Sequence, residues 1–157
     1  MLFRSFDYYA RLLTFVGDGS NSAADVRAKA AGHRKAAEAQ WNGKQLRRAW
    51  LGPTLGWLGE KGLWLEPQPW AIIGGVTTPD QTGRLVRTVD ESLRQPSPIG
   101  AMQMNKSDDS LANGMVGAGM AINGGIWPSL NQTLIWALAL VNPQMAWDEW
   151  KKNTLAR

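Results

Sequence analysis

The chain of 157 residues contains 9 Trp and 17 Gly but no Cys, and its 17 Lys and Arg exceed its 13 Asp and Glu, giving a net charge of +4. A chain of this length can bury the core of one domain. The lack of Cys excludes a disulfide framework and fits a reducing, cytoplasmic location. No apolar run could span a bilayer, and the basic residues are scattered, so we expect neither a membrane nor a nucleic acid as partner.

Two helices are predicted at the start of the chain. Apolar residues recur every three or four positions over 2–16, as on one face of a helix, and Gly17 and Gly19 end the pattern. A second, Ala-rich helix is predicted from Ser22 to about position 40, with Asp25 favourably placed in its first turn. Because the connection is short, we expect the two helices to pack antiparallel.

The next segment is predicted to leave the helical pattern. The Trp-Asn-Gly sequence at 41–43 favours a turn. Residues 44–52 then alternate in character, with Arg48 and Trp50 on one face and Arg47 on the other. This alternation favours a short extended arm.

Glycines and prolines exclude a long helix over 53–70, so we expect an ordered loop there. The loop presents three aromatic side chains, those of Trp57, Trp64 and Trp70. Glu66 and Gln68 lie among them. A carboxylate beside Trp rings can be a general acid with a raised pKa, a sugar-hydroxyl acceptor or a salt-bridge partner, and the sequence leaves these three roles open.

Four further helices are predicted, over 70–75, 78–94, 128–141 and 143–155. Thr78 and Asn142 are good N-cap residues, and each is followed by a proline suited to a first helical turn. Three tryptophans fall on apolar faces of the last two helices, so we expect them in the core: Trp136, Trp147 and Trp150.

A long polar, Gly-rich loop is predicted over 99–125, where Lys106 is the one base and Asp108 and Asp109 are the acids. Loops of this length are typical of functional or disordered segments. The loop and the rest of the chain lack a metal-ligand pattern, a phosphate-binding P-loop and a dinucleotide fingerprint.

The junction between this loop and the helix at 128 gathers polar groups and an aromatic ring. Asn123, Gly124 and Gly125 allow close backbone approach. Trp127 and Ser129 flank the proline that starts the helix. A helix N-terminus with such neighbours can hold a sugar or an anion, although an ordinary loop-to-helix junction explains the same pattern.

Together the elements indicate an all-α fold of helical hairpins with long ordered loops at one end, because no segment has the pattern of a central strand. An (α/α) toroid or an irregular α domain fits this order. Trp stacks on the C–H face of a pyranose ring and keeps one N–H donor. Many Trp with many Gly and Asn are therefore typical of a carbohydrate cleft, although a Trp-rich core gives the same composition.

Three blocks, in order, resemble the catalytic domain of glycoside hydrolase family 94, the inverting β-glycoside phosphorylases. The blocks are Trp-Asn-Gly at 41–43 with Leu-Arg-Arg-Ala-Trp at 46–50, Pro-Gln-Pro-Trp-Ala-Ile-Ile-Gly-Gly at 67–75, and Asn-Gly-Gly at 123–125 with an aromatic soon after. The resemblance covers nearly the whole chain.

The resemblance implies that the chain, 1–157, is a single partial catalytic domain, roughly half of an (α/α)6 six-hairpin toroid. It places the general acid upstream of Met1 and part of the phosphate site downstream of Arg157. The implied reaction is phosphorolysis, in which inorganic phosphate as co-substrate attacks the anomeric carbon while an acid protonates the glycosidic oxygen. No cofactor is expected, and a small oligosaccharide and phosphate are the expected ligands.

Residue by residue, the resemblance assigns the loop lining the sugar and phosphate sites to Asn123, Gly124 and Gly125. The family's Lys-Glu before that Asn is Ala121-Ile122 here, and Ser129 stands where the family has a phosphate-contacting His. These departures suggest a different acceptor, such as the gluconate of the cellobionic acid phosphorylases, with Lys106 or Arg94 meeting its carboxylate. The expected sugar-binding residues are Glu66, Gln68, Trp70, Lys106, Asn123, Gly124, Gly125 and Trp127, with Ser129 for phosphate.

Two alternatives stay open at this stage. A related toroid hydrolase would use Glu66 as acid or base with Asp108 or Asp109 across the cleft. A non-catalytic sugar-binding or assembly module would bind without turnover. A half-toroid would also expose an apolar flank, so we expect self-association or packing on the remainder of a toroid.

Overall fold

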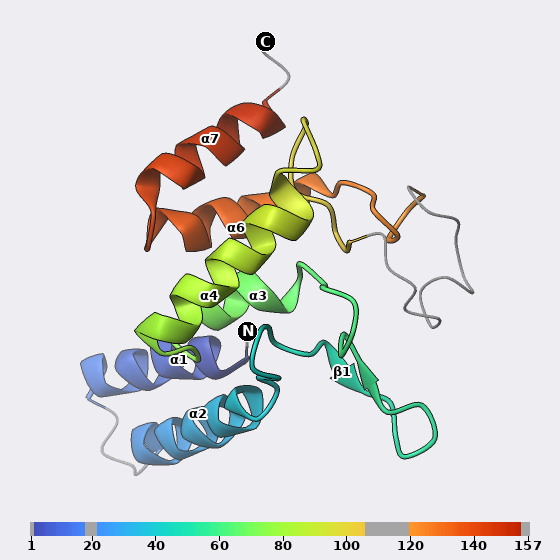
Figure 1. Cartoon of the computed structure of the whole chain (residues 1–157). Helices are drawn as coiled ribbons and strands as arrows, with labels where there is room; N and C mark the ends of the chain where they lie inside the picture. The colour runs from blue at the N-terminus through green and yellow to red at the C-terminus, as the bar shows by residue number, and fades with distance from the viewer. Residues whose placement is uncertain (1, 18–21, 106–119, 155–157) are drawn as a thin grey trace.

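The computed structural model describes residues 2–17, 22–105 and 120–154. It is mostly helical, at 56%, with one small two-stranded sheet, which confirms the all-α class. No helix in these ranges is long and apolar enough to cross a membrane. The elements are α1 (Leu2–Phe15), α2 (Ser22–Glu38), β1 (Ala49–Trp50), β2 (Trp57–Leu58), α3 (Pro67–Ile73), α4 (Pro79–Val89), the π-helix η1 (Asp90–Arg94), α6 (Pro128–Ala139) and α7 (Pro143–Asn153) (Figure 1).

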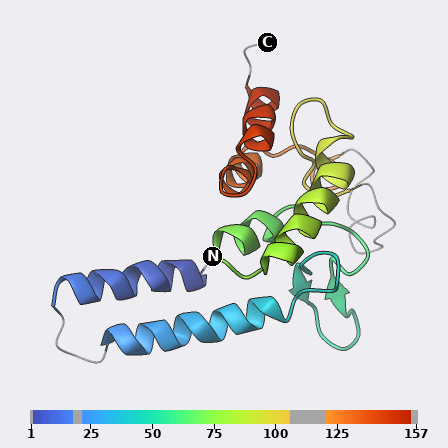
Figure 2. The same ribbon diagram turned by 60° about the vertical axis from the view of Figure 1, so that its left-hand side comes forward.

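Helices α1 and α2 form the antiparallel hairpin that their short connection predicted, and they extend away from the other helices (Figure 2). Polar contacts join them along their length. Arg34 Nη2 donates to Asp7 Oδ2 at 2.9 Å, and Arg27 Nη2 donates to Thr14 Oγ1 at 2.8 Å. Phe6 stacks on His33 with ring centroids 5.4 Å apart. The hairpin therefore holds together through contacts of its own.

The later helices begin where the capping residues predicted. Thr78 and Gln81 form a complete capping box before α4. Asn142 accepts a hydrogen bond from the Met145 N–H at 3.1 Å before α7. Both caps satisfy backbone donors that a helix start leaves without partners. The sequence therefore located these starts well.

The helix expected over 78–94 is regular only to Val89, because its last turn, Asp90–Arg94, widens into a π-helix. The turn directs Arg94 into the protein, where it is 5% exposed. Its Nε donates to Glu149 Oε2 at 2.8 Å, and its Nη1 pairs with Asp90. The suggestion that Arg94 meets a ligand carboxylate is therefore wrong, since carboxylates of the protein occupy it.

The loop expected over 53–70 is also corrected in part. Its first half forms a hairpin in which Ala49 pairs with Leu58 and Trp50 with Trp57. Gly52 and Gly56 adopt positive φ values of 93° and 72° in the connecting turn, a conformation that glycine tolerates at little cost. The predicted extended arm is thus one strand of this hairpin.

The three tryptophans expected in the core are exposed instead. Trp136, Trp147 and Trp150 keep 44%, 53% and 42% of their surface in solvent. Trp147 and Trp150 stack on each other, with ring centroids 4.8 Å apart and planes 11° apart. The apolar helical faces were recognised correctly, but the described elements leave a large part of each ring in solvent.

A buried polar cluster fixes the segment that enters the 101–105 stretch. The Ala101 N–H donates both to Asn131 Oδ1 and to Glu149 Oε1, each at 2.7 Å. Asn131 Nδ2 donates back to the Ala101 carbonyl at 2.9 Å. Glu149 and Asn131 are both fully buried. These contacts, with the Glu149–Arg94 pair, tie α6, α7 and η1 to one stretch of backbone.

Candidate functional site

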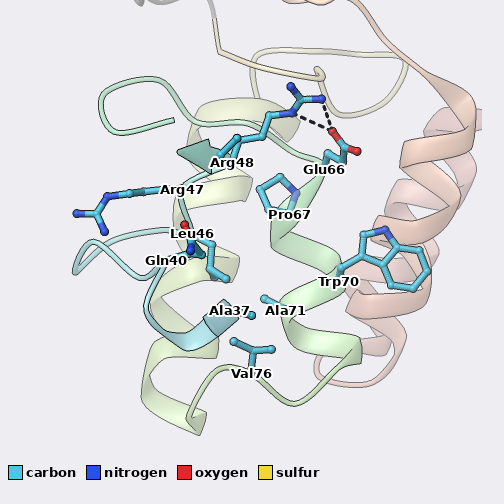
Figure 3. Close-up of a pocket in the computed structure, with 11 residues that line it drawn as sticks. Ala37, Gln40, Leu46, Arg47, Arg48, Glu66, Pro67, Trp70, Ala71 and Val76 are labelled. Atoms are coloured by element: carbon cyan, nitrogen blue, oxygen red, sulfur yellow. Dashed lines mark hydrogen bonds and ion pairs between the residues drawn. The ribbon is translucent and has the colours of Figure 1, made fainter. Parts of the chain in front are cut away.

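A cavity of about 580 Å³ opens between the end of α2, strand β1 and helix α3 (Figure 3). Its volume lies within the range of small-molecule sites. Its walls combine apolar side chains with a few polar ones. The polar and aromatic lining residues are Gln40, Arg47, Arg48, Glu66 and Trp70.

Arg48 and Glu66 meet at one end of this cavity (Figure 3). Arg48 donates from Nε at 2.9 Å and from Nη2 at 2.8 Å, and both bonds end on Glu66 Oε2. The second carboxylate oxygen, Oε1, therefore keeps its lone pairs for another donor. The two side chains are 36% and 43% exposed, so a ligand can reach them. Glu66 is the one carboxylate among the described residues that line the cavity.

Arg48 is held in place by an aromatic ring and not by its carboxylate alone. Its guanidinium lies over the ring of buried Trp64 at 4.6 Å from the centroid. A guanidinium on the face of an indole gains cation–π attraction while its edge stays free to hydrogen-bond. The geometry thus presents a fixed planar donor beside a carboxylate acceptor.

Gln68 is fully buried and is not among the residues that line the cavity. Its Oε1 accepts from the Leu46 N–H at 3.0 Å, and its Nε2 donates to the carbonyls of Leu46 at 2.9 Å and Trp64 at 2.7 Å. The side chain expected to bind sugar is therefore engaged by protein backbone. It joins the segment that carries Arg48 to the segment that carries Glu66.

Trp70 is half-buried and lines the cavity from α3. Its ring meets the edge of Trp136 from α6, with centroids 6.0 Å apart and planes at 80°. One aromatic residue thus belongs both to the cavity wall and to the α3–α6 contact. Glu66, the N-cap residue of α3, and Trp70, in its first turns, therefore both line this cavity, as the sequence predicted for one site.

The Asn-Gly-Gly loop is shaped by a close backbone approach. A Cβ at Gly125 would clash with the Ala121 carbonyl oxygen, so no residue but glycine fits this backbone. Ala121 itself has a φ of +44°. Gly124 also has a positive φ, of 89°, and Asn123 is 2% exposed. The close backbone approach predicted for this loop is therefore made to the chain's own Ala121 carbonyl at Gly125.

Trp127 and Ser129 lie at the start of α6 and are both exposed. Trp127 is the N-cap residue, and its Nε1 donates to the Ala121 carbonyl at 3.4 Å. Ser129 is in the first turn, where helix N–H groups lack intrahelical partners. The ring, the hydroxyl and the helix start are thus available at the surface.

The stretch 101–105 connects the two sets of predicted residues. The Leu65 N–H donates to the Gln103 carbonyl at 2.8 Å, and the Gln103 N–H donates to the Gly125 carbonyl at 2.8 Å. Isolated bridges join Trp64 to Met104 and Met102 to Ile126. The Glu66 segment and the Asn-Gly-Gly loop therefore flank one extended segment on its two sides.

The structure does not merge the two sets into a single cavity wall. None of Asn123, Gly124, Gly125, Trp127 and Ser129 lines the described cavity. Lys106, Asp108 and Asp109 lie outside the described residues, so their predicted roles stay predictions.

Sequence reasoning missed Arg48 and Trp64 as members of the site. The Arg-Arg pair at 47–48 and the nearby Trp were visible in the sequence. The contact between Arg48 and Glu66, however, spans 18 positions along the chain. No local periodicity encodes that contact.

Comparison of the chain with models of known protein families and with curated proteins finds no match.

Proposed function

We propose that this chain carries the sugar-binding part of an inverting β-glycoside phosphorylase-type active site, within one part of an (α/α)6 toroid. The main support is the Arg48–Glu66 pair, which lies at one end of a cavity of about 580 Å³ that Trp70 also lines. The resemblance of the three sequence blocks supplies the reaction class.

The pair suits a sugar because each hydroxyl of a pyranose both donates and accepts hydrogen bonds. The Arg48 guanidinium donates, and Glu66 Oε1 accepts, so neighbouring hydroxyls can bridge the two. Trp70 lines the same cavity, and its ring extends from α3 towards α6 (Figure 3). Burial of a sugar's C–H face against such a ring adds apolar contact to the polar recognition.

Glu66 is assigned to binding and not to proton transfer in this proposal. Its Oε2 already accepts two hydrogen bonds from a guanidinium, a geometry that suits an acceptor. The general acid would come from outside this chain, as the family resemblance implies. The acid would protonate the glycosidic oxygen while phosphate oxygen attacks the anomeric carbon, giving an inverted sugar 1-phosphate and a free acceptor sugar.

Phosphate would approach from the α6 side of the 101–105 stretch. Ser129 can donate one hydrogen bond there, and the helix start favours negative charge. This assignment rests on the resemblance, and it makes Trp127 and the Asn-Gly-Gly loop neighbours of the phosphate.

The test is saturable sugar binding by the whole chain, measured by isothermal titration calorimetry with cellobiose, cellobionic acid and glucose. We expect binding of cellobiose or cellobionic acid and a loss of about tenfold or more in Glu66→Gln and Arg48→Lys, because each removes a charge-assisted or bidentate hydrogen bond. Asp80→Asn is the matched control, since Asp80 pairs with Arg84 on the exposed face of α4, away from the cavity.

Three results would contradict parts of this proposal. Absence of saturable binding for all the sugars would overturn the sugar site. Equal losses in Asp80→Asn and Glu66→Gln would make the effect general and not local. Robust phosphorolysis by the chain alone would overturn the assignment of the general acid to a region outside it.

A further inference from the structure

A second set of the same three residue types lies next to the Arg48 set. Arg47 lies over the ring of Trp57 at 5.2 Å and pairs with Glu60. Arg48 lies over Trp64 and pairs with Glu66. Two consecutive arginines thus each have an indole beneath and a glutamate beside them. The two indoles differ in exposure, because Trp64 is buried whereas Trp57, on strand β2, is half-buried.

An aromatic ring that solvent reaches, that of Trp50, lies against the Trp57 set. Trp50 lies opposite Trp57 across the β1–β2 hairpin, with ring centroids 5.1 Å apart and planes at 54°. Trp50 is 52% exposed. An indole that served only the core would be covered by other side chains. A large exposed ring near an arginine–glutamate pair is instead typical of a ligand-binding surface.

The hairpin is rigid enough to serve as a platform. The Leu51 N–H donates to the Gly56 carbonyl at 2.9 Å, and the Gly56 N–H donates to the Gly52 carbonyl at 2.8 Å. Arg48 N–H donates to the Leu58 carbonyl at 2.8 Å at the other end. The backbone that carries Trp50 and Trp57 is thus ordered before any ligand arrives, which lowers the entropy cost of binding.

The platform is continuous with the candidate sugar cavity. Arg47 belongs to both, because it lines the cavity and also stacks on Trp57. Ala49 lines the cavity as well, and Trp50 is the next residue along β1. A ligand that leaves the cavity past Arg47 therefore approaches the hairpin that carries Trp57 and Trp50.

Resting on the proposed function, we propose that Trp50, Trp57, Arg47 and Glu60 form a second sugar subsite, so that the site takes β-linked gluco-oligosaccharides longer than a disaccharide. The first sugar units occupy the cavity at Arg48 and Glu66. A further unit stacks on Trp50 and bonds the Arg47–Glu60 pair. Trp50 is then the residue that determines preference for chain length.

The experiment measures the affinity of the whole chain for cello-oligosaccharides of two, three and four glucose units by isothermal titration calorimetry. The unaltered chain is expected to bind a longer oligosaccharide about fivefold more tightly than cellobiose, the worth of one additional stacked ring. Trp50→Ala is expected to remove that gain and to leave the affinity for cellobiose unchanged. Trp147→Ala is the matched control, because Trp147 is 53% exposed on α7 and is expected to change neither affinity.

Each other outcome overturns the subsite. Cellobiose binding without any gain from length, or a gain that Trp50→Ala retains, overturns the subsite and leaves the proposed function intact. Absence of binding to every oligosaccharide overturns both. If Trp50→Ala changes the sedimentation coefficient of the chain but not the gain from length, the exposed ring is a protein-contact surface and the subsite is overturned. Thermal unfolding of both variants checks that they are folded.

Discussion

Two of the glutamates that pair with arginine, Glu149 and Glu66, show how burial separates a structural role from a recognition role. Arg94 and Glu149 have side chains 6% and 0% exposed, and Glu149 also accepts from the Ala101 backbone. Arg48 and Glu66 have side chains 36% and 43% exposed, and both hydrogen bonds from Arg48 end on Glu66 Oε2. The same type of ion pair is therefore buried and fully hydrogen-bonded in one place, and open to solvent in the other.

The difference lies in desolvation. A buried pair must satisfy its hydrogen bonds within the protein, and removal of one member leaves the other charged and without water. An exposed pair is screened by solvent and contributes little to stability. The Arg94–Glu149 pair thus fixes the arrangement of η1, α7 and the 101–105 stretch, whereas the Arg48–Glu66 pair is free to exchange water for a ligand.

The largest expected effect comes from removing Glu149, and with it the buried ion pair to Arg94. Glu149→Ala leaves Arg94 in a buried site with Asp90 as its remaining carboxylate partner, and the Ala101 N–H loses one acceptor. We expect a loss of about 3–5 kcal/mol in the free energy of unfolding, measured in urea. A loss below about 1 kcal/mol would show that the pair behaves like an exposed one.

The second effect concerns the backbone on the other side of the 101–105 stretch. Gly125→Ala places a methyl group against the Ala121 carbonyl, so the loop must shift. We expect a loss of about 1–3 kcal/mol in unfolding free energy. Gly32→Ala is the matched control of opposite sign, because that position in α2 has open space, and helix propensity favours Ala by about 0.5–1 kcal/mol. Equal effects at both positions would contradict the role of the close approach.

A smaller effect is expected at the exposed pair. Glu66→Gln removes the Arg48 ion pair but keeps the side chain's shape, so its unfolding free energy is expected to fall by less than about 1 kcal/mol. Chemical denaturation measures this beside Glu149→Ala. Destabilisation as large as that of the buried pair would mean that Glu66 serves the fold and would remove the structural support for a recognition role.

The smallest effect is a pH dependence at another partly exposed carboxylate, that of Asp148, whose side chain is 44% exposed. On the surface of α7, the hydrogen bond from Lys151, helped by that from Gln144, lowers the pKa of Asp148. Because the folded pKa lies below the unfolded one, the contribution to stability is present above the unfolded pKa and is lost as the pH falls through the folded one. A comparison of Tm for the unaltered chain and Asp148→Asn is expected to show a small gap near neutral pH that closes in acid. A gap that widens in acid would contradict the sign.

The helical part of the fold could be predicted because its signals are local. Thr78 with Pro79 and Asn142 with Pro143 carry cap chemistry within one turn, so the starts of α4 and α7 follow from the sequence alone. The Glu66 and Trp70 part of the candidate site was predicted for a similar reason, since both residues lie within one short segment beside Pro67 and Pro69.

The errors share a different cause. Periodicity marks Trp147 and Trp150 as one apolar face, but it does not show whether another element covers that face. The role of Arg94 depends on the π-turn that directs it towards Glu149, and Arg48 depends on a partner in another segment. Contacts between distant segments decide these positions, and they leave no local pattern.

The backbone hydrogen bonds of Gln103 predict how amide hydrogens near it exchange with solvent deuterium. Its carbonyl accepts from Leu65 and its N–H donates to Gly125, so one residue bridges the backbone on both sides of the candidate site. Lifting that residue away breaks both bonds in one opening event. The amides of Leu65 and Gln103 are therefore expected to exchange together as one cooperative unit. The same opening would free the Glu66 segment and the Asn-Gly-Gly loop from each other.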